Sequence, residues 1–284
     1  MTDFTASRPL RNLGTGVDPR ELGLTVLGAE AMGEFLRAQA FGTHQMRRGF
    51  TGAKEAQFPI IGRATAQFHV PGTEIDGNTI QTGQRLIALE DLLVSPVFIA
   101  NIDEVLRHFD ARSPYARAIG ETLGRSYDQN VARTAVLAAR DTSTIPGAEG
   151  HGDGGQLTNA AYATDGSVLF DGFFDAGVTL AEKDVPMEGV KGFVRPVQYA
   201  LIVQSDRPID RDLSPNNGSL AEGIVRRING IPLVRTNNVP GADDTANTGI
   251  HSSRRADYSP TVGVVYHKDA IGSLDGVPIQ VESE

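Results

Sequence analysis

The most regular pattern of apolar positions lies between residues 113 and 140. Ser113 and Pro114 form a typical helix start, with a capping hydroxyl followed by proline at the first helical position. Apolar side chains then recur every four residues, at Tyr115, Ile119, Leu123, Tyr127 and Val131. This spacing predicts one helix about 42 Å long, which would nearly cross a compact globule of this chain length, about 50 Å wide. We therefore expect a spine helix in an elongated body.

A second pattern alternates between apolar and polar residues. Residues 57–70 and 84–93 each read as an extended strand, and turn-forming residues are dense in the intervening segment 71–83. The pattern predicts a long two-stranded ribbon whose strands would reach about 30–40 Å each. Such a ribbon is only marginally stable alone in water. It must lie against its own domain or against a neighbouring molecule, and the pattern favours neither.

The remaining pattern mixes short helices and strands and predicts an α+β fold. Residues 1–24 and 142–166 carry no apolar period and read as an irregular arm and a glycine-rich loop. Apolar spacing predicts helices over 25–48, 103–109, 171–183 and 219–226. Strands are predicted at 193–194, 228–237, 261–266 and 276–282, and an apolar segment at 199–203 lies beyond Pro196.

Composition narrows the possible functions. The 284 residues are 40% hydrophobic and 21% charged, which excludes a disordered or collagen-like chain. The absence of cysteine excludes a thiol nucleophile and cysteine-based metal sites. A net charge of −9 argues against attraction of the whole chain to nucleic acid. No apolar stretch approaches the roughly 18 residues of a membrane helix, so we expect a protein made in a cytoplasm, without a membrane partner.

Motifs for catalysis are weak. Gly150–Gly155 matches the dinucleotide pattern G-x-G-x-x-G, but it follows a predicted helix rather than a strand, which favours a surface loop. The six histidines form no pair at helical metal-binding spacing. Asp206, Asp210 and Asp212 lie among arginines and favour a solvated turn over a cation site. We expect no catalytic, metal or cofactor site, and an oligomeric enzyme using the Gly150–Gly155 loop is the weaker alternative.

Several short segments, taken together and in order, resemble the major capsid proteins of short-tailed, T7-like bacteriophages. The likeness runs from about Gly33 to Gly272. The segments that carry it are Lys54–Arg63, Val70–Glu74, Leu92–Val94, Phe98–Asp103, Arg107–Tyr115, Ala181–Pro186, Val194–Tyr199 and Ile228–Pro240.

The resemblance implies the HK97-like shell fold of tailed phages. It implies an N-terminal arm at 1–49, an extended loop at 50–95, a peripheral domain with the spine helix at 96–144, an axial domain at 145–258 and returning peripheral strands at 259–284. Relatives are expected to continue with a further segment that completes the peripheral domain. The residues expected to contact a neighbouring subunit through the extended loop are Phe58, Arg63, Phe68, His69, Glu74, Asp76, Arg85 and Glu90.

The same resemblance implies a structural, non-enzymatic function in the virion. The expected partners are further copies of the chain in hexamers and pentamers of an icosahedral head, a scaffold protein, a portal, and packaged double-stranded DNA in weak nonspecific proximity. Some relatives crosslink a loop lysine to a neighbour, but residues 55–182 contain no lysine, so no such crosslink is expected. A cellular nanocompartment shell of the same fold is the alternative.

Overall fold

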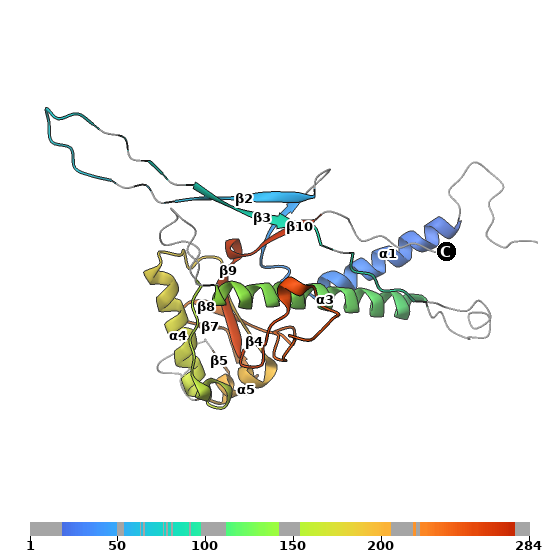
Figure 1. Ribbon diagram of the computed structural model, residues 1–284. Helices are drawn as coiled ribbons and strands as arrows, with labels where there is room; N and C mark the ends of the chain where they lie inside the picture. The colour runs from blue at the N-terminus through green and yellow to red at the C-terminus, as the bar shows by residue number, and fades with distance from the viewer. Residues whose placement is uncertain are drawn as a thin grey trace, which may run out of the picture. The chain divides into compact units, whose positions relative to one another are not determined.

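The computed structural model describes most of the chain as two compact units (Figure 1). The described residues are 19–49, 54–62, 64, 66–75, 77, 79–80, 82–90, 92–97, 112–141, 154–205, 218–219 and 222–275. Unit 1 comprises residues 1–39, 92–127 and 277–284, and unit 2 comprises residues 40–91 and 128–276. The long helix α3, Arg112–Arg140, contributes its first part to unit 1 and its second part to unit 2.

Unit 1 is built on two closely packed helices, α1 (Pro19–Arg37) and the first part of α3. Gly120 lies so close to α1 that a side chain there would begin 2.2 Å from the Ala31 carbonyl oxygen. The rings of Phe35 and Tyr127 meet with their centroids 5.9 Å apart. The predicted spine helix is confirmed. Helix α1 begins and ends earlier than the predicted helix over 25–48.

Unit 2 contains the main sheet, in the strand order β7-β8-β4-β9. Strand β4 (Val190–Val194) pairs parallel with β8 (Ile231–Arg235) and antiparallel with β9 (Gly263–His267), while β7 (Arg227–Ile228) pairs with β8. A second, two-stranded pair joins β5 (Gly218–Ser219) to β6 (Ile224–Val225).

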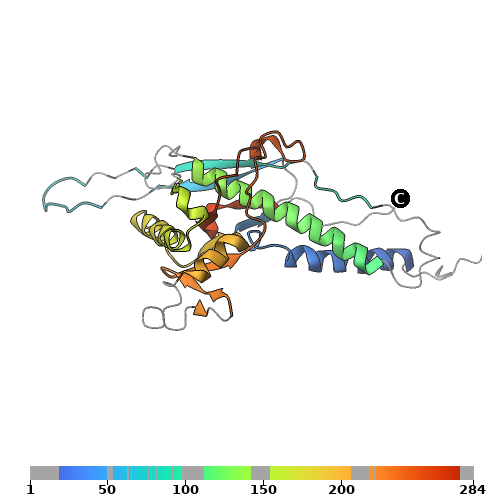
Figure 2. The same cartoon turned by 90° about the horizontal axis from the view of Figure 1, so that it is seen from below.

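Helices α4 (Gly166–Glu182) and α5 (Pro196–Gln204) pack together against one face of this sheet (Figure 2). The Asp165 side chain caps α4 by accepting from the Ser167 amide at 2.8 Å, which explains why the helix begins before the predicted residue 171. Buried side chains from both helices meet the sheet at Val194 and Ile228. The turn η1 (Ala160–Ala163) precedes α4.

The opposite face of the sheet is covered by the turn that follows α1. Phe193 points to this side and stacks on Phe41, with ring centroids 4.1 Å apart, while Tyr266 lies 5.4 Å from Phe193. His44 completes this aromatic cluster, and the Phe41 and Phe193 side chains are fully buried. Alternating side chains of β4 therefore contribute to two cores.

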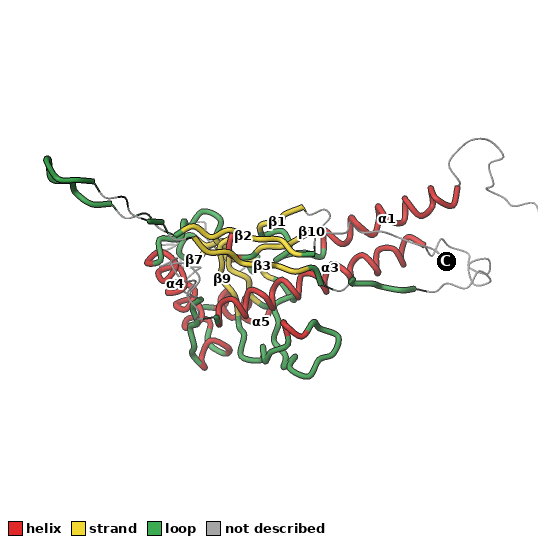
Figure 3. The backbone as a smooth tube through the Cα atoms, turned by 45° about the horizontal axis from the view of Figure 1, so that its top comes forward, coloured by secondary structure: helices red, strands yellow, loops and turns green. Residues whose placement is uncertain are grey.

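Strand β1 (Met46–Gly49) pairs parallel with β10 (Gly272–Asp275), and Figure 3 shows the pair beside β2. Strands β2 (Glu55–Ile61) and β3 (Thr82–Ala88) form the predicted ribbon, which we call the hairpin; its connecting residues 62–81 are called the tip. The short helices η2 (Ser252–Arg254) and η3 (Lys268–Ala270) flank β9.

Two sequence predictions are wrong or incomplete in this region. The helix predicted over 219–226 is instead the β5–β6 pair, with Gly223 at a φ of 63° between the strands. The strand predicted over 228–237 is interrupted by Asn229 and Gly230, whose φ angles of 47° and 79° form a tight hairpin turn. Pro196 does not merely break an apolar segment, because it begins α5. The elements predicted at 103–109 and 276–282 lie outside the described residues.

Candidate intersubunit surface

The paired strands β2 and β3, which we call the base of the hairpin, pack on their own unit through one face. Phe58 points inward and is 9% exposed, close to Gly272 of β10, where an added side chain would begin 3.0 Å from the Phe58 ring. The guanidinium carbon of Arg48 lies 5.4 Å from the centre of the same ring. The Leu89 amide donates to the Lys54 carbonyl at 2.9 Å and closes the base beyond the paired strands. The inner face of the base is therefore satisfied within the chain.

The outer face of the base and the tip expose apolar side chains. On the base, Ile61 is 66% exposed and Leu86 is 53% exposed. In the tip, Phe68 is completely exposed, and Figures 1 and 2 show the described part of the tip running away from the rest of unit 2. Val70, Ile75 and Ile80 are also exposed. These side chains have apolar area available for burial against another molecule.

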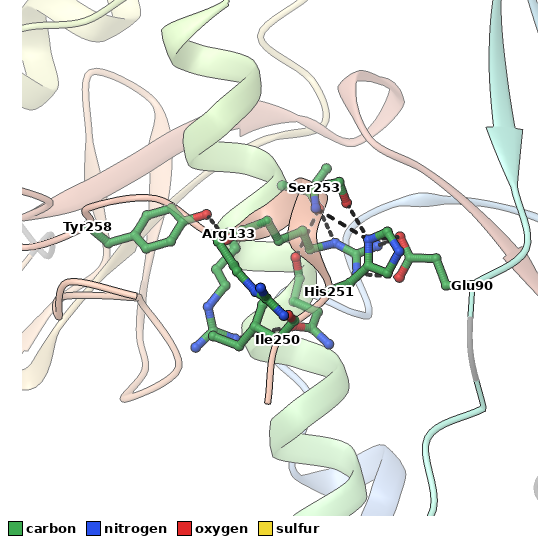
Figure 4. Close-up of polar contacts among 10 residues, drawn as sticks. Glu90, Arg133, Ile250, His251, Ser253 and Tyr258 are labelled. Atoms are coloured by element: carbon green, nitrogen blue, oxygen red, sulfur yellow. Dashed lines mark hydrogen bonds and ion pairs between the residues drawn. The ribbon is translucent and has the colours of Figure 1, made fainter. Parts of the chain in front are cut away.

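A bidentate ion pair ties the segment that follows β3 to the rest of unit 2 (Figure 4). The Arg254 guanidinium nitrogens donate to the two carboxylate oxygens of Glu90 at 2.5 and 2.6 Å. The Nε of Arg254 donates to the Thr134 hydroxyl of α3 at 3.1 Å. A longer pair joins Arg85 of β3 to Asp141 at 3.9 Å. No local pattern indicates the role of Arg254, because it is 164 positions from Glu90.

A buried carboxylate fixes the turn after α1. Asp128 of α3 is fully buried and accepts from the amides of Gly42 at 2.7 Å and Ala40 at 3.0 Å, and from the Asn238 side chain at 2.6 Å. Burial raises the pKa of Asp128 above its ordinary value, although these hydrogen bonds oppose the shift. Because Asp128 holds the amides of residues 40 and 42, the chain leaves the helical path before residue 48.

The structure places the predicted loop residues in different environments. Phe58 is buried in its own unit and Glu90 is paired with Arg254, as described above. Phe68, His69 and Glu74 are exposed in the tip, and Arg85 reaches toward Asp141. Arg63 and Asp76 lie outside the described residues. The intersubunit role of all eight stays a prediction.

The predicted spine-helix residues share one side of α3 and become more buried toward its second part. Val131 is 7% exposed, and the others, Tyr115, Ile119, Leu123 and Tyr127, are half-buried. The sequence reasoning missed Asp128, whose partners lie at least 86 positions away.

The described residues offer little that resembles a catalytic centre. No group of three or more histidine, aspartate or glutamate residues among them is arranged to hold a metal ion. An open pocket of about 510 Å³ lies beside α4, between Phe174, Val178 and Met187. Of the Gly150–Gly155 loop, Gly154 and Gly155 are described, and Gly154 packs against the end of α3. In the described part of the chain, no helix is both long and apolar enough to span a membrane.

Comparisons with known proteins agree on one family. The family described as Gp10A-like major capsid protein matches residues 57–284. The major capsid protein of Escherichia phage T7 is 26% identical over 308 aligned positions, which cover 96% of this chain and 87% of the relative. The major capsid protein of Enterobacteria phage T3 is also 26% identical, over 93% of this chain and 83% of the relative.

Solved capsid structures share the fold. The capsid structure of cyanophage P-SCSP1u matches with a TM-score of 0.73 and 33% identity, covering 84% of this chain and 75% of that one. The mature capsid of bacteriophage PhiM1 matches with a TM-score of 0.70 at 16% identity, over 84% of this chain and 76% of that one, and this match supports the fold alone. Together they support the expected α+β, HK97-like fold. The chain belongs to the Gp10A-like family of phage major capsid proteins and is a structural protein of the capsid shell.

Proposed function

We propose that this chain builds an icosahedral phage head by laying its hairpin across a neighbouring copy in the shell. The observation that carries the proposal is the exposed apolar area of the hairpin's outer face and tip, which includes the complete exposure of Phe68. Burying one such side chain contributes about 1.5–3 kcal/mol. Each copy has many neighbours, so modest contacts of this kind add up over the shell.

The contact is heterologous, because the hairpin of one copy meets a different surface of the next. Repetition of such a contact around a ring closes hexamers and pentamers. Unit 1 has a second apolar segment suited to burial in the shell, since Leu92, Leu93 and Val94 are all more than half exposed. The predicted loop residues other than Glu90, and the boundaries of the arm, loop, peripheral and axial domains, belong to this proposal.

The proposed partners beyond other copies are a scaffold protein during assembly in the host cytoplasm, a portal at one vertex, and the packaged double-stranded DNA. The net charge of −9 is consistent with a shell wall that does not adhere tightly to DNA. We propose no cofactor and no enzymatic step.

The assembly role of the tip is tested by replacing its apolar side chains with charges. The double variant Phe68→Asp with Ile75→Asp should fold as the wild type does, because both side chains are already exposed, and should fail to form closed particles in electron micrographs. The matched control, Gln67→Asp with Thr79→Asp, adds two charges to the same tip without removing apolar area. Normal particles from the first variant would refute the proposal.

A further inference from the structure

We propose that the Glu90–Arg254 ion pair is the positioning contact that sets the direction of the hairpin before a neighbour arrives. The inference rests on the proposed function, since direction matters only if the hairpin reaches another copy. It also reassigns Glu90, which sequence reasoning places at an intersubunit contact, to a contact within its own subunit. We call the two side chains and the Thr134 hydroxyl the latch.

The latch has a geometry that restricts orientation. Glu90 lies two residues beyond the end of β3, and its carboxylate receives two parallel hydrogen bonds from Arg254. The Arg254 Nε also donates to the Thr134 hydroxyl. That hydroxyl in turn donates to the Asn130 carbonyl of the same helix, α3, at 2.9 Å. Because the planar guanidinium is held on two edges, it fixes both the distance and the angle of the carboxylate.

The segment that carries Arg254 is itself firmly attached to the second part of α3. Arg133 pairs with Asp244 at 2.9 Å, and the two side chains are only 12% and 11% exposed. Tyr258 is fully buried and donates its hydroxyl to the Arg254 carbonyl at 2.6 Å. Residues 244 and 256 are joined by a backbone hydrogen bond of 3.1 Å. Arg254 is therefore held on a segment that is fixed to α3 on one side and by Tyr258 on the other.

The second attachment of the hairpin restricts its angle less than the latch does. Phe58 is held against Gly272 by apolar contact, which is non-directional, and Arg48 donates one exposed hydrogen bond to the Gln57 carbonyl at 2.5 Å. The Arg85–Asp141 pair is long, at 3.9 Å, and its arginine side chain is 67% exposed. If Glu90 is released, the hairpin is free to pivot about Phe58.

A small pivot at the base is amplified at the tip. Fully extended chain advances about 3.3 Å per residue, so residue 75 in the tip lies up to about 40 Å from Ala88 at the end of β3. A tilt of about 10° would then displace the tip by roughly 7 Å, more than the 4.0–4.5 Å over which apolar side chains touch. A partly exposed ion pair adds little to folding stability. The expected effect of the latch is therefore on geometry and on assembly, rather than on unfolding.

The absence of cysteine from the chain makes a direct distance measurement possible. Spin labels on Gln67→Cys in the tip and Ala138→Cys on α3, both exposed positions of unit 2, report the hairpin direction by pulsed electron paramagnetic resonance on the unassembled full chain. We expect a narrow distance distribution in the otherwise unchanged chain and a clearly broader one with Glu90→Gln or Arg254→Lys. The double variant should be no broader than either single variant, because each change alone opens the latch.

Two further variants sharpen the result. Thr134→Ala removes the hydrogen bond from Arg254, together with the bond from Thr134 to the Asn130 carbonyl within α3, and keeps both charges of the latch. It should therefore broaden the distribution less than Glu90→Gln does. Glu121→Gln removes a more exposed ion pair with Arg125 that does not involve the hairpin, and it should leave the distance distribution unchanged.

An unchanged distribution in Glu90→Gln and Arg254→Lys would overturn the proposal. A narrow distribution combined with failed assembly in Glu90→Gln would also overturn it, because that result assigns Glu90 to a contact between copies. Failure of the proposed function is seen separately, as normal particles from the Phe68→Asp and Ile75→Asp variant, in which the latch residues are unchanged.

Discussion

The sheet of unit 2 and the tip of the hairpin use apolar residues in opposite ways. Phe193 in the sheet is fully buried in a cluster with Phe41 and Tyr266, whereas Phe68 in the tip is fully exposed. The same residue type therefore stabilises the subunit in one place and is left unburied in the other. The sheet is buried within one chain, while the tip leaves apolar area exposed for the neighbouring copy that we propose covers it.

The largest expected effect on the free energy of unfolding is in the sheet of unit 2. Phe193→Ala should lower the free energy of unfolding by about 3–5 kcal/mol, because it leaves a cavity between stacked rings. Chemical denaturation of the unassembled subunit followed by circular dichroism measures the change. The control is Phe68→Ala, which removes the same ring from the tip. Equal losses of unfolding free energy in Phe193→Ala and Phe68→Ala would contradict the difference between the buried sheet and the exposed tip.

A slightly smaller loss is expected at the carboxylate that fixes the turn over the sheet. Asp128→Ala leaves the amides of Gly42 and Ala40 and the side chain of Asn238 without their acceptor, at a cost of about 3 kcal/mol in total. Thermal or denaturant unfolding measures this loss. A cost indistinguishable from zero would mean that the turn is held by the aromatic cluster alone.

The pH dependence of Asp128 gives a second check. Its folded pKa is raised, so the folded state binds the proton more tightly, and the stability that this group contributes falls as the pH rises above 3.8. The asparagine in Asp128→Asn does not titrate. The amount by which the wild type is more stable than this variant should therefore become smaller as the pH rises above 3.8. A difference that widens with pH would contradict the raised pKa.

A smaller effect, with the opposite dependence of folding stability on pH, is expected from His44. Burial, with a contribution from Lys191, lowers the pKa of His44 below 6.5. The folded state therefore favours the neutral ring, and stability from this group is present above pH 6.5 and is lost as the pH falls below it. His44→Phe keeps an aromatic ring and should flatten this part of the stability profile. An unchanged profile would show that His44 does not titrate on unfolding.

The smallest expected effect on folding belongs to the tip. Phe68→Ser should change the unfolding free energy of the unassembled subunit by less than about 0.5 kcal/mol. Differential scanning calorimetry on the subunit tests this expectation, with Phe58→Ser as the contrasting variant because Phe58 is buried at the base. A large loss with Phe68→Ser would show that the tip is covered by its own chain.

The elements that sequence reasoning predicted well are those fixed by local pattern. The four-residue spacing from Tyr115 to Val131 is sufficient for α3, and the alternation on both sides of 71–83 is sufficient for the hairpin. The helix predicted over 219–226 is wrong, because Gly223 adopts a left-handed φ angle and β5 pairs with β6.

Contacts between distant positions were not predictable from one sequence. The β1–β10 pairing joins residues 46–49 to 272–275, and Glu90 meets Arg254, which is 164 positions away in the sequence. Neither Glu90 nor Arg254 lies in a local pattern that indicates this contact, because exposed glutamate and arginine are common on protein surfaces. The exposure of Ile61 and Leu86 depends on which face of the hairpin packs on β10, which alternation alone leaves open.

The burial of the tip by a neighbouring copy is tested most directly by thiol labelling of Ile75→Cys, which would be the single cysteine in the chain. The rate of reaction with a water-soluble thiol reagent is compared between unassembled subunits and purified shells, with Ala163→Cys as an exposed reference outside the hairpin. The account predicts rapid labelling of residue 75 in subunits and strong protection in shells, beyond any change at the reference. Equally rapid labelling of residue 75 in both states would contradict the claim that a second copy covers the tip.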